Sequence, residues 1–173
     1  MSTPTPDPLG EALVRECRRH LDESLERIRA CLSHLTTEET WRRPNEHTVS
    51  VGNLVLHLAG NVRQWIVSAL GAREDVRNRP AEFTERGPIP AAEILARLEA
   101  VMAVAAAVID RLDAGSLLER RRVQGFEETG LSILVHVVEH FSYHTGQIAY
   151  AVKAGKDLDL GFYRGVNLDR KGS

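Results

Sequence analysis

Three histidines recur at four-residue steps near the end of the chain, at His136, His140 and His144. In an α-helix, residues four apart lie on one face, with their Cβ atoms about 5–6 Å apart. His140 and His144 can therefore point their imidazoles at one spot. Neutral imidazoles are ligands for Zn²⁺, Ni²⁺, Cu²⁺ and Fe²⁺. The spacing predicts one half of a divalent-metal site.

A third ligand has to come from another helix, and His57 is the best candidate. It stands in the apolar run VLHLAG, where an imidazole without a polar partner would cost free energy. Three imidazole ligands leave a fourth position open, as in catalytic metal sites. The alternative is a set of hydrogen-bonded core histidines. His136 is either a fourth ligand, which would close the site, or a histidine packed beside it, and we favour the latter.

Three polar residues beside these histidines are candidates for handling a proton or a substrate. Asn61 lies one turn beyond His57, and Gln147 lies one turn beyond His144. Either side chain could bind substrate or orient water, or could only satisfy neighbouring polar groups. Glu139 could act as a general base or as a hydrogen-bond acceptor for a histidine, or could point to solvent. No single general base is indicated.

Helices must position these side chains, because apolar residues recur every three or four positions through most of the chain. Ser50 is expected to cap the second long helix, and Gly155 to end the fourth. A short helix capped by Thr36 or Thr37 is expected after the first. No alternating pattern is long enough to predict a sheet. We expect long helices at 8–35, 50–71, 91–114 and 129–154.

Four amphipathic helices of this length predict an all-α four-helix bundle, with residues 1–173 as a single domain. The connections after the first three helices are longer than tight antiparallel hairpins require. A topology with crossover connections is therefore expected.

The composition excludes several other classes of protein. The 173 residues carry 22 basic and 24 acidic side chains, a net charge of −2 that argues against nucleic-acid binding. No apolar run reaches the ~20 residues of a membrane helix, and no signal peptide pattern opens the chain. Cys17 and Cys31, ~21 Å apart on one helix, cannot pair. We expect a cytoplasmic protein with reduced thiols, a catalytic thiol being the less favoured alternative.

The segments NLVLHLAGNVRQWIVSALG (53–71), DVRNRPAEF (75–83) and HVVEHFSYHTGQIAY (136–150) resemble the DinB-like, or DinB/YfiT-like, superfamily. The resemblance implies a four-helix bundle with crossover topology, commonly a homodimer, and one divalent metal, usually zinc or nickel. Its ligands are one histidine of the second helix and an HxxxH pair of the fourth. They map onto His57, His140 and His144.

Characterised members of the superfamily include thiol S-transferases that use bacillithiol or mycothiol and a mycothiol-dependent maleylpyruvate isomerase. The resemblance therefore implies a thiol-dependent S-transferase with a low-molecular-weight thiol and a small-molecule substrate. The chemistry is sensible, because a metal ion with an open position can bind and deprotonate a thiol. A hydrolase, a non-catalytic metal-binding or stress-response dimer, and a metal-free interaction module are the alternatives.

Overall fold

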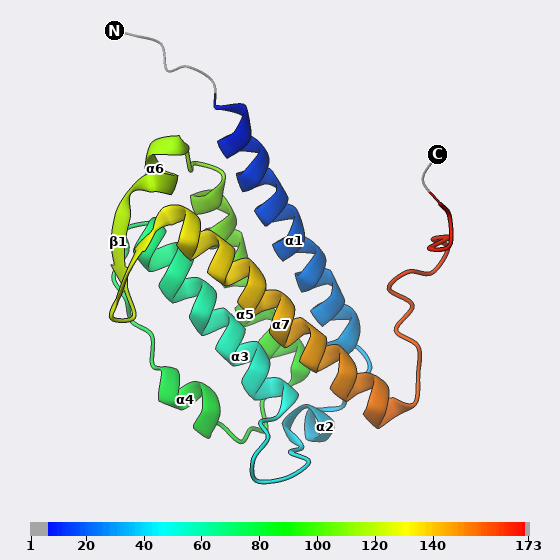
Figure 1. Ribbon diagram of the computed structural model, residues 1–173. Helices are drawn as coiled ribbons and strands as arrows, with labels where there is room; N and C mark the ends of the chain where they lie inside the picture. Colours follow the sequence, from blue (N-terminus) through cyan, green and yellow to red (C-terminus); the bar gives the residue numbers. More distant parts are fainter. Residues whose placement is uncertain (1–6, 172–173) are drawn as a thin grey trace, which may run out of the picture.

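The computed structural model describes residues 7–171, and they form an all-α bundle, as predicted (Figure 1). The core is made where four long helices meet, with fully buried Ile28, Leu58, Leu98 and Phe141 each coming from a different one. The four are α1 (Pro8–Leu32), α3 (Val51–Val62) continued by the π-helix η1 (Arg63–Leu70), α5 (Ala91–Ile109) and α7 (Gly130–Lys156).

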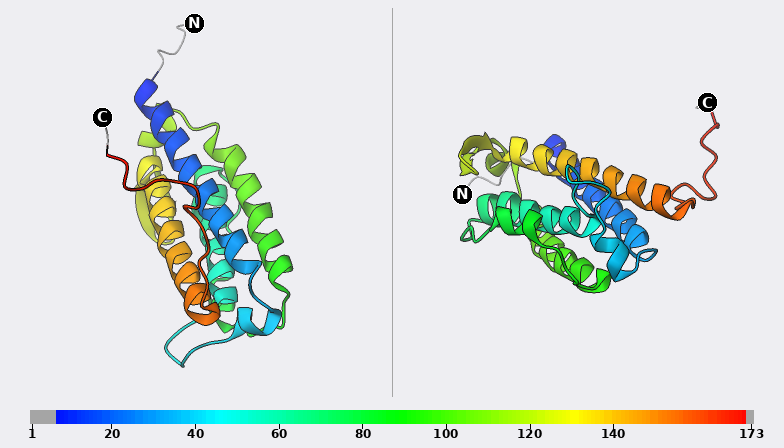
Figure 2. Two further views of the ribbon diagram at one scale, coloured as in Figure 1. Left: turned by 90° about the vertical axis from the view of Figure 1, so that its right-hand side faces the viewer. Right: turned by 90° about the horizontal axis from the view of Figure 1, so that it is seen from below.

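The four helices are connected by crossovers, which confirms the predicted topology. Helices α1 and α3 each pack against both α5 and α7. Helices α1 and α7 run in one direction, and α3 and α5 run in the other (Figures 1 and 2). Because α3 and α5 are parallel neighbours, the 71–90 connection must return along the bundle. It carries the short helix α4 (Arg79–Thr84).

Side-chain caps set the start of the second long helix. The hydroxyl of Ser50 accepts a hydrogen bond from the backbone N–H of Asn53, and the Asn53 side chain accepts one from the N–H of Ser50. The same Asn53 donates to the carbonyls of Glu82 and Glu85. One residue thus fixes the start of α3 and holds α4 against it. The predicted Ser50 cap is confirmed.

Two of the expected helices are too long, because capping residues begin new elements inside them. Thr36 and Glu39 form a capping box that starts α2 (Thr37–Trp41), as predicted, so α1 ends before residue 35. Asp113 accepts a hydrogen bond from the N–H of Ser116 and starts α6 (Ala114–Leu118), so α5 ends before residue 114. The fourth helix instead continues through Gly155, and Asp157, in a left-handed conformation, ends it.

The connection before α7 contains a small hairpin, so the expectation of no sheet was wrong. Strand β1 (Arg120–Val123) pairs antiparallel with β2 (Phe126–Thr129). Gln124 and Gly125 form the turn. Both have positive φ, as the two central residues of a type I′ hairpin turn require. Each strand has four residues, and this is too short to show an alternating pattern. Within residues 7–171, no helix is long and apolar enough to cross a membrane.

Candidate metal centre

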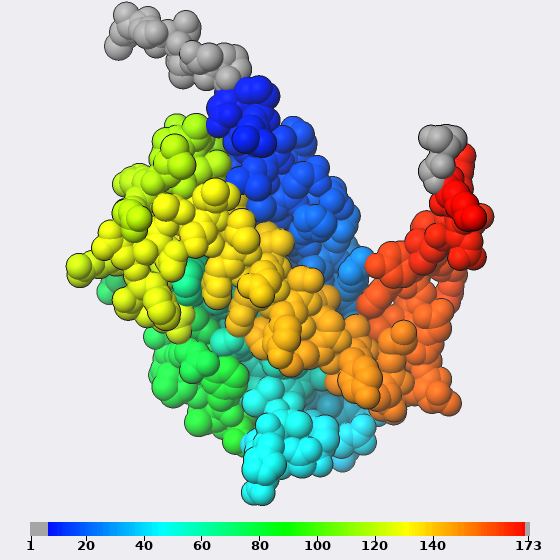
Figure 3. Space-filling model, in the orientation of Figure 1, coloured from blue at the N-terminus to red at the C-terminus, as the bar shows by residue number. Residues whose placement is uncertain are grey.

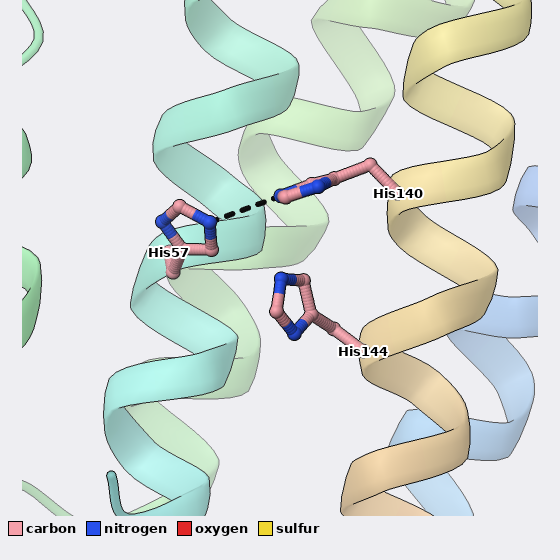
Figure 4. Close-up of side chains that lie close together, drawn as sticks. All are labelled: His57, His140 and His144. Carbon is pink, nitrogen blue, oxygen red and sulfur yellow. Dashed lines mark hydrogen bonds between the residues drawn. The ribbon is translucent and has the colours of Figure 1, made fainter. Parts of the chain in front are cut away.

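His57 on α3 faces His140 and His144 on α7 across the interface between the two helices (Figure 4). One ligand atom from each of the three side chains lies within 4.8 Å of the others. The Nε2 atoms of His57 and His140 are 3.0 Å apart. The structure thus brings together the three residues that the sequence singled out.

The surroundings keep the imidazoles of His140 and His144 neutral. Burial lowers the pKa of His140 to about 3, and the neighbouring His144 and His57 add to the effect. Burial also lowers the pKa of His144. Both rings are therefore uncharged near neutral pH, and the neutral imidazole is the form that binds a metal ion.

A carboxylate behind His57 was missed by the reading of the sequence. Glu82 on α4 is buried, and its Oε2 lies 2.8 Å from Nδ1 of His57. Burial acts to raise the pKa of Glu82, but hydrogen bonds from Arg77 and His57 outweigh it and the pKa is lowered. Because an ionised carboxylate only accepts, Nδ1 of His57 must donate, and the lone pair of the ring sits on Nε2, toward the other histidines.

Arg77 holds this carboxylate in place. Its Nε and Nη2 donate to the two oxygens of Glu82 at 2.7 and 2.8 Å, and its Nη1 donates to Gln64 at 2.9 Å. Gly60 on α3 leaves room for the pair, since a Cβ there would lie 1.9 Å from Oε1 of Glu82. The Phe83 ring lies 4.8 Å from the ring of His57. The 71–90 connection therefore supplies both an acceptor and a cover for His57.

His144 is oriented in the same manner by a residue that the sequence did single out. Gln147 is exposed, and its Oε1 accepts a hydrogen bond from Nδ1 of His144 at 2.7 Å. This leaves the lone pair of His144 on Nε2. The arrangement supports the interpretation of Gln147 as a partner of a histidine.

Asn61 and Glu139 lie in contrasting environments. Asn61 is buried, and within residues 7–171 its Oδ1 has no hydrogen-bond partner. Glu139 is exposed. Burial lowers the pKa of His136, and the charge of Glu139 opposes that shift. The catalytic roles suggested for Asn61 and Glu139 stay predictions.

His136 packs beside the group of three. Its ring stacks on Trp65 of η1, with the ring centroids 3.9 Å apart, and lies 5.5 Å from the ring of His140. Trp65 in turn donates a hydrogen bond from its indole nitrogen to Gln124 in the hairpin turn, at 3.1 Å. His136 and Trp65 thus form a wall between the three histidines and the hairpin.

The donor set fits a divalent ion such as zinc or nickel. All three ligand atoms are imidazole nitrogens. The rings of His57 and His144 are each held by a hydrogen bond at Nδ1, the ring nitrogen on the other side from Nε2. The 3.0 Å separation of the two Nε2 atoms is near the ~3.3 Å expected of two ligands 2.0–2.1 Å from a tetrahedral ion.

Fold and site together define a DinB/YfiT-like bundle with a three-histidine centre. A family model described as mycothiol-S-transferase matches residues 16–151, a range that includes the three histidines and Glu82. The chain belongs to this family. No curated protein matches it. A crystal structure of a conserved protein from Enterococcus faecalis shares the fold, with a TM-score of 0.70 and 20% identity over 82% of this chain and 97% of that one.

Proposed function

We propose that this protein is a metal-dependent thiol S-transferase that uses mycothiol or a related low-molecular-weight thiol. The observation that carries the proposal is the meeting of three histidines in a chain of the mycothiol-S-transferase family. His57, His140 and His144 would hold one divalent ion, zinc or nickel, because imidazole suits both. Three protein ligands leave a position open for the thiol.

A bound ion of this kind lowers the pKa of a thiol, so that the sulfur is a thiolate near neutral pH. The transfer joins that sulfur to an electrophilic carbon of the acceptor and breaks the bond from this carbon to its leaving group. The products are the thioether, the leaving group as an anion and the thiol proton. Glu82 and Gln147 serve the reaction by holding His57 and His144 in one tautomer.

The chain's own thiols do not suit the role of nucleophile. Cys17 and Cys31 are buried in the core. Burial raises the pKa of both, to about 11 for Cys31. Because the thiolate is the reactive form, neither is activated near neutral pH. An external thiol is therefore the better nucleophile.

The test combines metal analysis with a transfer assay. Untagged protein, purified without added metal, is compared with His57→Ala and His144→Ala for metal content and for transfer of mycothiol to an alkyl halide. We expect about one equivalent of metal in the wild type, as three ligands to one ion require, and loss of both metal and transfer in each variant. Unchanged metal content and transfer in His57→Ala would refute the proposal.

The second candidate is a non-catalytic protein in which the metal only stabilises the bundle. It is favoured by the placement of the ligands on two different helices, since one ion would then join α3 to α7. A protein that binds metal, loses much of its stability when the metal is removed, and transfers no thiol would support this candidate.

A further inference from the structure

A groove of about 900 Å³ lies along the C-terminal half of α7. The helix forms one side of it, from Tyr143 to Gly155, and the 42–49 segment with the beginning of α3 forms the other. Both sides face the viewer in Figure 3, with α7 in orange and the segment before α3 in cyan. The volume is that of a site for a small molecule of drug size.

One end of the groove lies beside the candidate metal centre, although none of the three histidines lines it. Gln147 lines the groove with the same side chain that holds His144 by a hydrogen bond. Leu54, also in the lining, precedes His57 by one turn of α3. From His144 to Gly155 the helix rises ~16 Å. A molecule that reacts beside the histidines can therefore extend along the groove away from them.

Most of the lining is apolar, and aromatic rings stand on its edge. Tyr143 is 63% exposed and Tyr150 is 76% exposed, and both lie on the α7 side. Gly146 lies between them, and a Cβ there would have no atom within 4 Å. The helix therefore presents an open floor at Gly146 between two aromatic side chains, where a planar apolar group can lie.

The far end of the groove is positive. Arg42 lines this end, with its guanidinium beside Gly155. The nearby carboxylate of Glu39 is already paired with Lys156 at 2.7 Å. Within the part of the chain that the structure describes, no carboxylate lies within salt-bridge distance of Arg42, and no acidic side chain lines the groove. The groove thus offers a free cation and no anion.

We propose that this groove binds the acceptor of the transfer, and that the acceptor combines an aromatic body with an anionic group, a carboxylate or a sulfonate, at the end distant from the reacting carbon. The aromatic body lies on the floor at Gly146, between Tyr143 and Tyr150. The anionic group lies at Arg42. This assignment of the groove rests on the proposed S-transfer, because a molecule bound there is an acceptor only if the protein transfers a thiol to it.

The test measures binding rather than transfer, by the fluorescence of 2-naphthoate and of the neutral 2-naphthalenemethanol. We expect naphthoate to bind the wild type more tightly. Arg42→Gln should weaken naphthoate binding about tenfold and leave the alcohol unaffected. Gly146→Leu, which fills the floor, should weaken both ligands at least about tenfold. Ser142→Leu, one turn earlier on α7 and outside the lining, is the matched control and should change neither.

Circular dichroism confirms that each variant is folded. Equal affinity of the wild type for the two ligands, or naphthoate binding unchanged by Arg42→Gln, would overturn the proposal. Naphthoate binding to His57→Ala tests the groove assignment separately from the proposed S-transfer, because His57 does not line the groove. If His57→Ala binds naphthoate and the wild type transfers no thiol, the groove assignment as an anion site holds and the proposed reaction fails.

Discussion

At the scale of single residues, the pair formed by Arg77 and Glu82 has two functions that can be separated. The arginine side chain is 2% exposed and the glutamate side chain 9%. Glu82 therefore neutralises a buried guanidinium and also accepts the hydrogen bond from Nδ1 of His57. The first function concerns the stability of the fold, and the second concerns how well His57 can bind a metal ion.

Replacing Glu82 should affect both functions. Glu82→Gln leaves Arg77 buried without a counter-charge, and we expect the free energy of unfolding in urea to fall by about 3–5 kcal/mol. Metal affinity, measured by competition with a chelator, should fall about 10–100-fold, because the imidazole loses an anionic acceptor.

The double variant Arg77→Leu with Glu82→Gln distinguishes the two effects. Removing the arginine removes the unpaired charge, so most of the lost stability should return. The metal affinity should remain low, since the acceptor is still absent. Recovery of both quantities together would show that Glu82 acts on the metal only through the stability of the fold.

At the scale of the helices, replacing either of two helical glycines by alanine should change the free energy of unfolding, with opposite signs at the two positions. Both lie inside helices, where alanine is normally about 0.5–1 kcal/mol more favourable than glycine. At Gly60 the new Cβ would lie 1.9 Å from Oε1 of Glu82, and at Gly146 it would meet no atom within 4 Å. Gly146→Ala should therefore raise the free energy of unfolding, and Gly60→Ala should lower it. The same sign for both would contradict the packing of α4 on α3.

The helices and the three histidines could be predicted because both follow from spacing within one segment. His140 and His144 are four residues apart, and Ser50 lies next to the helix that it caps. Glu82 could not be predicted, because it meets His57 through a connection of irregular structure whose path depends on Asn53. The hairpin was missed since its strands are too short and too charged. The π-helical turns from Arg63 to Leu70 lie in a segment that reads as ordinary helix.

At the scale of the whole molecule, exposed apolar side chains on α6 and α7, two helices that pack against each other, suit a homodimer contact. Leu118, Leu131 and Val135 are 72%, 36% and 48% exposed. Such a cluster commonly marks an interaction surface. We propose that two copies associate here. Leu131→Lys with Val135→Lys should give a monomer in sedimentation equilibrium, whereas Val104→Lys on α5, equally exposed at 36%, should not. A wild-type monomer would exclude the proposal.

Metal removal should also act on the whole molecule, because the three candidate ligands come from two helices that are far apart in the sequence. A ligand that binds only the folded state adds about 4 kcal/mol of stability when its free concentration is a thousand times its Kd. Adding a chelator should therefore lower the free energy of unfolding of the wild type by up to about 4 kcal/mol. The same chelator should leave His57→Ala itself unchanged, and this makes it the control for any direct effect on the fold. If the chelator destabilises both proteins equally, its effect does not pass through the three histidines, and they are better explained as hydrogen-bonded core residues.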